Sequence, residues 1–577
     1  MTFLTLIQHF ERLEATTKRL EMFEILAELF RLSDAEEIDK IIYLTQEQLL
    51  PSFYTLEMGM SEKLLVRAIT DASGNKLPEV QQHFKTSGDL GKTTEYFLSS
   101  RPGTNLEITA VYSQLRDLAR MSGEGSVEKK VGALAALLKS SSPTEAKYVS
   151  RFVVGRMRLG AGNATILEAL SLAKTGERKS KAILERGFNL CSDLGKVGRI
   201  LFTDGIAGIE HIRPTVGSPI RMALCERIAN PEDVIKKIGR CSVEPKLDGF
   251  RCQIHKSKGN VEIFSRNLER TTPMFPELLE ATKTAINAES IIFEGEALSY
   301  DDLTGELQPF QVTIQRKRKH GIAQAATDIP LKLFAFDLLY VNGEDWTDRS
   351  YSDRRARLGS VIADNPVIEL GHADETDDPA EFARIFQSAI DKGAEGVVAK
   401  RPDGPYKAGA RDFNWIKLKR SYKGTLADTV DVCLVGYFNG KGARAAFGIG
   451  AVLATVYDPD TDAFKTVSRL GSGFSQEEWA QLRDVLDAHS SESMPPRVDS
   501  TVTPDVWVHP HTVITVMADE ITRSAMHTCG KDEHGIGYAL RFPRAKGFIR
   551  SDKNPEDATT VGEIITMSEN QKLVKLA

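Results

Sequence analysis

The amino-acid sequence predicts a multidomain protein in which an all-α region precedes an α+β domain and a C-terminal β-barrel. Its 577 residues suffice for about three to four domains of ordinary size. Hydrophobic periodicity is helical in the first third of the chain, mixed in the middle and strand-like towards the end. We therefore predict domains at residues 1–212, 213–422 and 423–577.

Residues 1–212 show helical periodicity almost throughout. Within residues 10–32, apolar side chains recur at spacings of three and four, which is the pattern of an amphipathic helix. Ser61 and Ser142 each precede an acidic residue within one turn, and these residue types favour a helix start. Strand-like alternation is scarce here, so this region is predicted to be all-α.

The middle of the chain changes character at the Pro/Gly-rich passage of residues 213–219, which suits a linker or an extended entry strand. From Val243 to Lys419, short β-rich runs alternate with helical stretches. This alternation predicts an α+β domain built on antiparallel strands.

The third region begins after Ser421, where short strands are separated by Gly, Asn-Gly and Asp-Pro turns. Several strands within about 140 residues are typical of a small β-barrel. Residues 561–576 return to a helical pattern and are predicted to form a terminal helix.

The composition bounds the class of protein. With 41% hydrophobic and 27% charged residues, the chain resembles an ordinary soluble globular protein. The sequence contains no run of about 18 apolar residues, the length needed to span a bilayer. Charged residues also occur too early at the N-terminus for a secretory signal. We therefore expect a cytoplasmic protein with no membrane segment.

Charge and cysteine content identify no partner. The 74 Lys and Arg residues against 80 Asp and Glu argue only weakly against a nucleic-acid partner, because phosphate recognition depends on where the cations cluster. The six cysteines are scattered without CxxC spacing. That pattern predicts separate reduced thiols and no zinc site.

The segment Glu244–Arg251, EPKLDGFR, contains the candidate nucleophile Lys246. A lysine in a partly buried strand, beside an acid and a glycine, can act as a nucleophile when burial and neighbouring cations lower its pKa. The other interpretation is an ordinary salt-bridged lysine on a surface strand. The KxDG pattern by itself leaves both interpretations open.

A series of further short motifs follows KxDG, and the order of the series removes the ordinary interpretation. Any one of these motifs could be a sheet fragment with a charge at its end, whereas all of them in this order are not accidental. The motifs are Ser265-Arg266-Asn267, residues 293–296, residues 336–340, residues 395–400, Arg411 and residues 415–419.

This ordered set resembles the motifs of the covalent nucleotidyltransferase superfamily, and above all those of the archaeal-type (replicative) ATP-dependent DNA ligases. Residues 1–212 resemble the DNA-binding domain of that family, including the stretch Arg156–Gly162. Residues 213–422 resemble its adenylylation domain, an ATP-grasp-like nucleotidyltransferase. Residues 541–553 resemble the last family motif, which lies in an OB-fold barrel.

The resemblance implies an enzyme that seals nicks in double-stranded DNA during replication, repair and recombination. Lys246 would attack the α-phosphate of ATP and become lysyl-AMP, and the AMP would pass to the 5′-phosphate at a nick before the 3′-hydroxyl displaces it. Mg²⁺ or Mn²⁺ would assist. The choice between ATP, ADP and other nucleotides stays open, because it depends on the shape of the pocket.

The resemblance also assigns site residues. Glu244 would accept from the adenine amino group and Phe336 would stack on the base, whereas Arg251 and Glu296 would hold the ribose. Asp248 would position either the water shell of the metal or the lysine. The nucleotide contacts are Glu244, Arg251, Arg266, Glu296, Phe336, Arg411, Lys417, Lys419, Arg550 and Lys553, and the metal ligands are Glu296 and Glu395.

Arg544, Arg550 and Lys553 would orient the leaving pyrophosphate, which requires the barrel to swing about a hinge near Ser421–Gly424. Nicked duplex DNA is the expected partner, and the protein is expected to be a monomer. A sliding clamp is a further candidate partner. Residues 92–97, KTTEYF, carry the paired aromatics of a clamp-binding peptide but lack its glutamine.

Three other classes of protein agree less well with the sequence. RNA ligases and capping-type guanylyltransferases share KxDG, but residues 1–212 resemble a domain that encircles DNA. A nicotinamide-dependent ligase would carry a four-cysteine zinc module, which this sequence does not have. A catalytically silent scaffold has no need to retain Lys246 together with Glu296, Glu395, Lys417 and Lys419.

Overall fold

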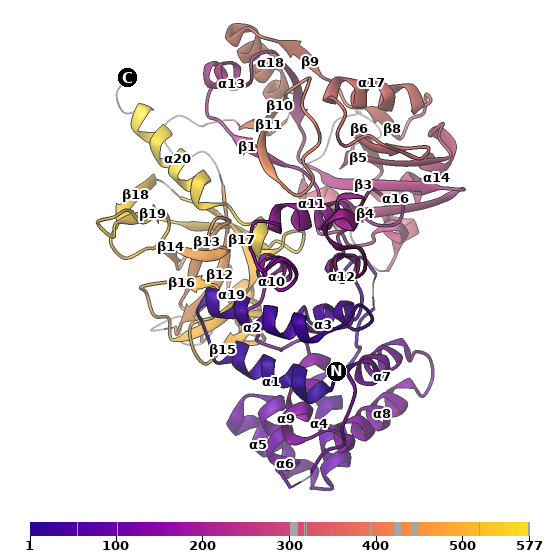
Figure 1. Cartoon of the computed structure of the whole chain (residues 1–577). Coiled ribbons are helices and arrows are strands. Elements are labelled where there is room, and N and C mark those ends of the chain that lie inside the picture. The colour runs from indigo at the N-terminus through magenta and orange to yellow at the C-terminus, as the bar shows by residue number, and fades with distance from the viewer. Residues whose placement is uncertain are drawn as a thin grey trace. The chain divides into compact units, whose positions relative to one another are not determined.

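The computed structural model describes the chain except for residues 55, 101, 301–309, 317, 319, 393, 420–428, 441–447, 519 and 575–577. The chain forms two compact units, Met1–Phe188 with Ser192–Ile212, and Asn189–Cys191 with Arg213–Ala577 (Figure 1). The described part contains no helix of the length and apolarity that crossing a membrane requires. The hinge expected at Ser421–Gly424 and the boundary expected at 422 lie outside the described residues.

The first unit is helical, as predicted. Ser61 and Ser142 both cap helices: Ser61 accepts from the backbone N of Leu64 at 3.4 Å, and Ser142 forms a reciprocal capping box with Glu145. Its helices are α1 (Phe3–Glu14), α2 (Arg19–Leu32), α3 (Ile38–Thr45), α4 (Glu62–Ser73), α5 (Leu77–Ser87), α6 (Leu90–Phe97), α7 (Ile108–Arg120), α8 (Ser126–Ser140), α9 (Pro143–Val153), α10 (Asn163–Thr175), α11 (Lys181–Cys191) and α12 (Leu194–Glu210).

Two stretches of this unit bear on the sequence predictions. Residues 92–97 lie within α6, where the Tyr96 ring is 62% exposed and stacks on His83. The stretch Arg156–Gly162 forms the turn before α10, and the backbone N of Met157 donates to the carboxylate of Glu47.

The second unit begins with two β-sheets, and all but two of the strand pairs recorded in them are antiparallel. A five-stranded sheet has the order β1-β11-β10-β2-β9, and a six-stranded sheet has the order β4-β3-β5-β6-β7 with β8 beside β6. The predicted α+β class is therefore confirmed. The strands are β1 (Leu224–Arg227), β2 (Cys241–Lys246), β3 (Phe250–Ser257), β4 (Asn260–Ser265), β5 (Ser290–Ser299), β6 (Leu331–Val341), β7 (Glu344–Asp345), β8 (Ile368–Leu370), β9 (Asp374–Thr376), β10 (Gly396–Lys400) and β11 (Arg411–Lys419).

Helices cover these sheets and complete two cores. Val234 of α13 and Phe382 of α18 pack against Val243 and Ile416 of the five-stranded sheet. The helices α14 and α17 contribute Leu278 and Leu358 to the core of the six-stranded sheet. The helices are α13 (Pro231–Ile238), α14 (Pro276–Ala285), α15 (Phe310–Thr313), α16 (Ile322–Asp328), α17 (Tyr351–Val361) and α18 (Pro379–Asp391).

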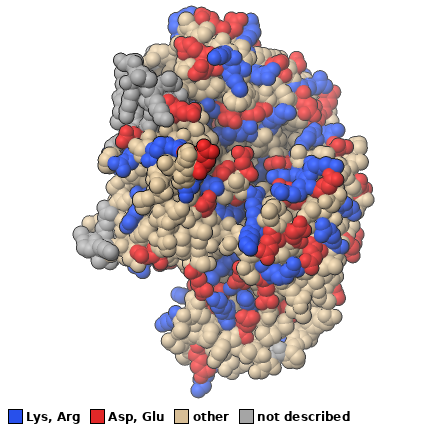
Figure 2. Space-filling model, turned by 60° about the vertical axis from the view of Figure 1, so that its left-hand side comes forward, with Lys and Arg blue, Asp and Glu red and all other residues tan. Residues whose placement is uncertain are grey.

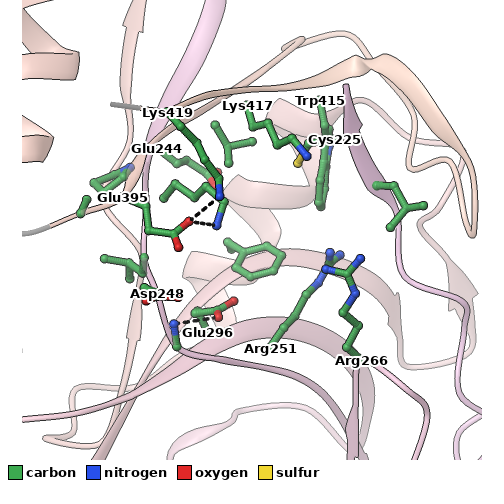
Figure 3. Close-up of a pocket in the computed structure, with 18 of the residues that line it drawn as sticks. Cys225, Glu244, Asp248, Arg251, Arg266, Glu296, Glu395, Trp415, Lys417 and Lys419 are labelled. Atoms are coloured by element: carbon green, nitrogen blue, oxygen red, sulfur yellow. Dashed lines mark hydrogen bonds and ion pairs between the residues drawn. The ribbon is translucent and has the colours of Figure 1, made fainter. Parts of the chain in front are cut away.

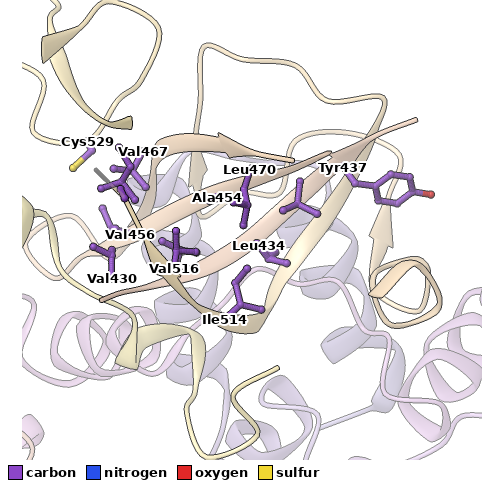
Figure 4. Packing of buried hydrophobic residues seen from close by; sticks show 14 of the residues in the cluster. Val430, Leu434, Tyr437, Ala454, Val456, Val467, Leu470, Ile514, Val516 and Cys529 are labelled. Carbon is purple, nitrogen blue, oxygen red and sulfur yellow. The ribbon is translucent and has the colours of Figure 1, made fainter. Parts of the chain in front are cut away.

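The C-terminal part contains a third sheet, of order β15-β17-β12-β13-β14-β16, with β20 paired to β17. Its core is aliphatic, with Val430, Leu434 and Ile514 all fully buried (Figure 4). The elements are β12 (Val430–Phe438), β13 (Ala451–Asp458), β14 (Ala463–Leu470), α19 (Gln476–Asp487), β15 (Ser490–Ser491), β16 (Val498–Asp499), β17 (Val506–Met517), β18 (Glu520–Ser524), β19 (Gly537–Arg541), β20 (Arg544–Ile549) and α20 (Val561–Val574).

This third sheet differs from the prediction in two ways. The recorded pairings among the described residues follow an open path that ends at β15 and β16, so they form a half-barrel and do not confirm a closed barrel. The sequence also predicts separate strands at residues 506–510 and 511–521, whereas residues 506–517 form the single strand β17. Pro510 is tolerated because it lies between Trp507 and Thr512, where the register with β12 shifts and no ladder hydrogen bond is required.

Candidate functional site

A cavity of about 470 Å³ in the second unit gathers the residues predicted to carry chemistry. This volume suits a small-molecule ligand. Its wall comes from both sheets of the α+β region (Figure 3) and also includes residues of the C-terminal part of the chain. The predicted residues that line it are Glu244, Lys246, Asp248, Arg251, Arg266, Glu296, Phe336, Glu395, Arg411, Lys417, Lys419, Arg550 and Lys553.

Lys246 lies at the end of β2, opposite Gly396 of the neighbouring strand β10. Gly396 also pairs with Lys419 of β11, so three adjacent strands bring the two lysines to the same carboxylate. The Oε2 of Glu395 lies 2.7 Å from the Nζ of Lys246 and 3.4 Å from that of Lys419 (Figure 3). The lysine side chain is 27% exposed and therefore accessible from the cavity.

The prediction that the site lowers the pKa of Lys246 was wrong. Burial does act in that direction, but the charge and hydrogen bond of Glu395, with the charges of Glu296 and Asp248, outweigh burial and raise this pKa. Neighbouring cations were expected to lower this pKa, whereas the strand register brings the carboxylate of Glu395 to the amine. In the structure as it stands, Lys246 is an ammonium group.

Three carboxyl groups crowd this end of the cavity. Burial and then the charge of Glu395 raise the pKa of Asp248 to about 6. Burial raises the pKa of Glu296 to about 7, although Lys246 opposes that shift. In contrast, Lys246 and Lys419 overcome the burial of Glu395 and lower its pKa to about 2. This end of the cavity carries more carboxylate than its lysines neutralise, so it suits a cation.

Arg251 is held by a buried network behind the cavity wall. Its Nη2 donates to Glu294 at 2.7 Å, and its Nη1 donates to the carbonyl O of Ala223 at 2.9 Å. The hydroxyl of Tyr406 donates to the same Glu294 oxygen at 3.0 Å. The Arg251 guanidinium carbon lies 5.4 Å from the ring centroid of Phe336, so the arginine and the aromatic form one surface of the cavity.

Glu244 is held on the opposite side by two partners to which the sequence assigned no role. The Nζ of Lys400 lies 2.9 Å from Glu244 Oε2, and the hydroxyl of Tyr351 donates to Oε1. The side chain of Glu244 is 10% exposed and that of Lys400 is 1% exposed. The carboxylate therefore has one fixed orientation at the cavity wall.

The basic residues expected to contact phosphate are already paired with carboxylates. Glu563, near the start of α20, lies 2.7 Å from both Arg411 Nη1 and Lys417 Nζ. Burial opposes the charge of Glu563, but Lys417 and Arg411 hold its pKa well below the usual range. Arg266 lies 3.4 Å from Asp557 in the same C-terminal segment.

The last predicted motif divides into residues inside and outside the cavity. Arg550 and Lys553 follow β20 and line the cavity, where Arg550 donates two hydrogen bonds of 2.7 Å to Asp552. Arg544 starts β20, is exposed and does not line the cavity. The structure therefore brings Arg550 and Lys553 to the site and leaves Arg544 out.

The residues that sequence reasoning missed are mostly partners of those it found. Tyr351 and Lys400 hold Glu244, Glu294 holds Arg251, and Glu563 holds Lys417. Lys400 lay within a recognised motif, at the end of residues 395–400, and this was the one signal available. The others carry no local pattern, because their contacts join segments far apart in the chain.

The cavity offers carboxylates that could bind a divalent metal ion. No group of three or more His, Cys, Asp or Glu side chains arranged to hold a metal ion occurs in the described part of the chain. Mg²⁺ commonly takes one or two protein carboxylates and completes its shell with water and phosphate. Glu395 and Glu296 could supply these one or two carboxylates, since both line the carboxylate-rich end of the cavity.

The surface shows no uniformly basic face in the view drawn. Lys and Arg side chains are intermingled with Asp and Glu over the face in Figure 2. This agrees with the formal net charge of −6 for the sequence. Basic side chains also line the cavity, where they could recognise anionic groups.

Comparisons with known proteins agree across the chain. The family model described as "ATP dependent DNA ligase domain" matches residues 222–419, "DNA ligase N terminus" matches residues 2–171, and "ATP dependent DNA ligase C terminal region" matches residues 445–553. A probable DNA ligase of Dictyoglomus thermophilum is 50% identical over 100% of this chain and 99% of its own length. The DNA ligase of Hyperthermus butylicus is 43% identical over 99% of this chain and 98% of its own.

Proposed function

The chain belongs to the family of ATP-dependent DNA ligases, and from that premise we propose that it seals nicks in duplex DNA through a covalent AMP on Lys246. The observation that carries the choice of residue is the position of Lys246 in the cavity, with Glu395 at 2.7 Å and Lys419 beside the same carboxylate. A nucleophile, an acid that controls its proton and a second cation for phosphate are thereby assembled at one place.

The first step joins Lys246 to the nucleotide. The amine nitrogen attacks the α-phosphorus of ATP, a P–N bond forms, and the P–O bond to pyrophosphate breaks. The attacking amine must be neutral, so the ammonium proton leaves towards the carboxylate of Asp248, whose pKa is raised to about 6. Lys417 and Lys419 neutralise charge on the phosphate as it develops.

The next two steps transfer and release AMP. The 5′-phosphate at the nick attacks the phosphorus of lysyl-AMP, which frees the lysine and leaves DNA-adenylate. The 3′-hydroxyl then attacks the 5′-phosphate, forms the phosphodiester and expels AMP. Arg266 and Arg411 line the cavity and are proposed to contact the AMP phosphate in these steps.

Base and ribose recognition is proposed for the wall of the cavity. Phe336 would stack on adenine, which is worth about 1–3 kcal/mol for a base on an aromatic ring. Glu244, oriented by Lys400 and Tyr351, would accept from the adenine amino group. Arg251 and Glu296 would hold the ribose hydroxyls.

A divalent ion, Mg²⁺ or Mn²⁺, is proposed to bind with the nucleotide at Glu395 and Glu296. When bound, it would neutralise the phosphates and polarise the α-phosphorus. Engaging Glu395 as a ligand would also withdraw the partner that keeps Lys246 protonated. The carboxylate excess at this end of the cavity supports the assignment.

Membership of the ligase family also supports proposals about domain roles, oligomeric state, location and partners. The helical first unit would bind the duplex, the C-terminal half-barrel would act as an OB-fold domain, and the protein would work as a monomer in the cytoplasm beside the nucleoid. Replication, repair and recombination all leave the nicks it would close. A sliding clamp is kept as a candidate partner through residues 92–97.

The test is covalent labelling. The purified full-length chain is incubated with Mg²⁺ and α-³²P-labelled ATP, GTP or adenylate-labelled NAD⁺, without DNA, and the label surviving denaturing electrophoresis is measured. We expect label from ATP that disappears in Lys246→Ala and is discharged by nicked duplex with a sealed product. Lys465→Ala is the matched control, because Lys465 pairs with Asp499 away from the cavity.

Two outcomes would contradict this proposal. Absence of label from every nucleotide in a folded protein would overturn the enzymatic function and favour a scaffold. Label from GTP alone would favour a capping-type guanylyltransferase.

A further inference from the structure

Asp431 contacts both basic side chains that the C-terminal part of the chain contributes to the cavity. It is the second residue of β12, and its side chain lines the cavity while being only 15% exposed. Its Oδ2 pairs with the Nζ of Lys553, and its Oδ1 lies 3.7 Å from Nη1 of Arg550. No role was assigned to this residue from the sequence or from the family.

The Asp431 side chain is itself fixed. The Thr515 hydroxyl donates to Asp431 Oδ1 at 2.6 Å, and the same hydroxyl accepts from Arg550 Nη1 at 3.2 Å. On the backbone, Asp431 N donates to Thr559 Oγ1 at 3.0 Å, and Thr559 N donates to Asp431 O at 2.8 Å. The carboxylate is thus anchored to β17 and to the segment before α20.

The two basic groups reach the opposite wall of the cavity. Burial lowers the pKa of Lys553 and the charge of Asp431 opposes that shift, while the positive charges of Arg266 and Arg550 lower the pKa further. The negative charge of Asp248 acts on Arg550. Lys553, Arg550 and Asp431 line the same cavity as the residues proposed to surround the phosphates.

We propose that Asp431 is a positioning residue for the first chemical step, holding Lys553 and Arg550 in the orientation that receives the β- and γ-phosphates of the nucleotide. This inference rests on the proposed function, because it assumes that pyrophosphate leaves from this cavity. Donors held in place need no reorganisation as charge develops. A displacement of about 1 Å can cost roughly a hundredfold in rate.

Charge alone predicts the opposite effect. The cluster holds two cations, Arg550 and Lys553, and two carboxylates, Asp431 and Asp552. Replacing Asp431 by asparagine would leave one extra positive charge, so simple attraction predicts tighter binding of ATP and pyrophosphate. Positioning predicts weaker binding of both, and the sign of the change separates the two explanations.

The experiment compares Asp431→Asn with the natural full-length chain. The rate of lysyl-AMP formation is measured against ATP concentration, and the reverse discharge of lysyl-AMP against inorganic pyrophosphate concentration. We expect KM for both ligands to rise about tenfold or more. Sealing of a nick that already carries 5′-adenylate should be unchanged, because that reaction uses neither phosphate group.

Asp462→Asn is the matched control. Asp462 is a buried aspartate between β13 and β14, lies 2.6 Å from Arg497 and does not line the cavity. It should leave both KM values unchanged. If Asp431→Asn does not fold, Thr515→Val, which removes the hydroxyl that contacts both Asp431 and Arg550, should raise the same two KM values.

A double-mutant cycle adds a second readout. If Asp431 acts through Lys553, Asp431→Asn should add little to the effect of Lys553→Met. An unchanged or lower KM for ATP and pyrophosphate in Asp431→Asn would overturn the inference, and so would an equal loss in sealing of the pre-adenylylated nick. Lack of lysyl-AMP in the natural chain would instead overturn the proposed function.

Discussion

The Nζ of Lys246 lies 2.7 Å from the Oε2 of Glu395, and this pair decides which protonation state the nucleophile adopts. The contact follows from the strand register, since Glu395 directly precedes Gly396, which lies opposite Lys246, and the Glu395 backbone N donates to the Lys246 carbonyl at 3.0 Å. A carboxylate in this position stabilises the ammonium form, whereas attack requires the amine. Activation therefore requires that the pair be broken or neutralised.

Replacing Glu395 by glutamine should move the pH dependence of lysyl-AMP formation to lower pH. Burial lowers the pKa of Lys246 and Glu395 is the main group that raises it, so without the carboxylate this pKa falls and the amine is neutral at lower pH. The maximal rate should also fall, by roughly 10- to 100-fold, because a proposed metal ligand is lost.

Single-turnover labelling across a pH series would measure both effects. Glu375→Gln is the control, since Glu375 lies on β9, pairs with Arg240 and does not line the cavity. A midpoint that stays in place in Glu395→Gln would contradict the assigned coupling.

Glu563→Gln should lower KM for ATP in the first step. Glu563 pairs with Arg411 and Lys417 at 2.7 Å each, so the nucleotide must displace this carboxylate to reach them. Burial would raise the pKa of Glu563, but Lys417 and Arg411 hold it well below the usual range. Glu563 is therefore charged from neutral to alkaline pH and should compete equally with ATP for these two side chains over that range. We expect KM to fall several-fold, as for removal of a competing charge.

The matched variant is Glu556→Gln, which removes a carboxylate that pairs with Arg497 from the same C-terminal segment. Initial rates of lysyl-AMP formation at varied ATP would separate the two variants. An equal KM for Glu563→Gln and the natural chain would show that the contact does not compete with ATP.

Asp337→Ala should destabilise the fold strongly, although Asp337 lies within a recognised motif next to Phe336. Asp337 and Arg354 are both fully buried, with Arg354 Nε 2.7 Å from Asp337 Oδ1. Removing one partner leaves an uncompensated buried charge, which typically costs about 3–5 kcal/mol. Urea unfolding followed by tryptophan fluorescence would report the change in the free energy of unfolding.

The exposed pair of Arg401 and Asp403 provides the control for that experiment. The Asp403 side chain is 74% exposed, and exposed pairs contribute about 0–1 kcal/mol. If Asp337→Ala is no more destabilising than Asp403→Ala, the assignment of Asp337 as structural is wrong.

Gly396→Ala should impair both stability and labelling. A Cβ at this position would lie 2.1 Å from the carbonyl O of Leu418, so the neighbouring strands β10 and β11 must separate. Overpacking of this kind costs about 1–3 kcal/mol. The same shift would move Glu395 and Lys419 away from Lys246, so lysyl-AMP formation should decrease by more than the loss of folded protein.

Gly547→Ala is the matched strand glycine, because nothing lies within 4 Å of a Cβ built there. The soluble folded fraction and the labelling rate would be measured on both variants. Normal labelling in a folded Gly396→Ala protein would contradict the proposed geometry.

Much of the fold was predictable because helices and strands leave patterns in the local sequence. Helical periodicity identified the first unit, and Ser61 and Ser142 cap helices where their chemistry indicated. The β-rich runs between Val243 and Lys419 correspond to recorded strands. Closure of the third sheet was not predictable, because strand pairing depends on register between distant segments.

The sequence indicated most of the residues that share the cavity, whereas their roles stay predictions and their electrostatics could not be predicted. The residues assigned to the nucleotide and the metal line one cavity, except Arg544, which lies outside it. The pKa of Lys246 was predicted in the wrong direction, because its sign depends on which of several nearby charges is closest.

The sequence by itself determined the residue types that can perform the chemistry, their order along the chain and the class of each region. Only the tertiary structure decided that Glu395 faces Lys246, that Glu563 faces Lys417 and that Asp431 supports Lys553. The reason is physical. Periodicity and motifs arise from neighbours within a few residues, whereas electrostatic energy depends on distances of a few ångströms between segments that only folding brings together.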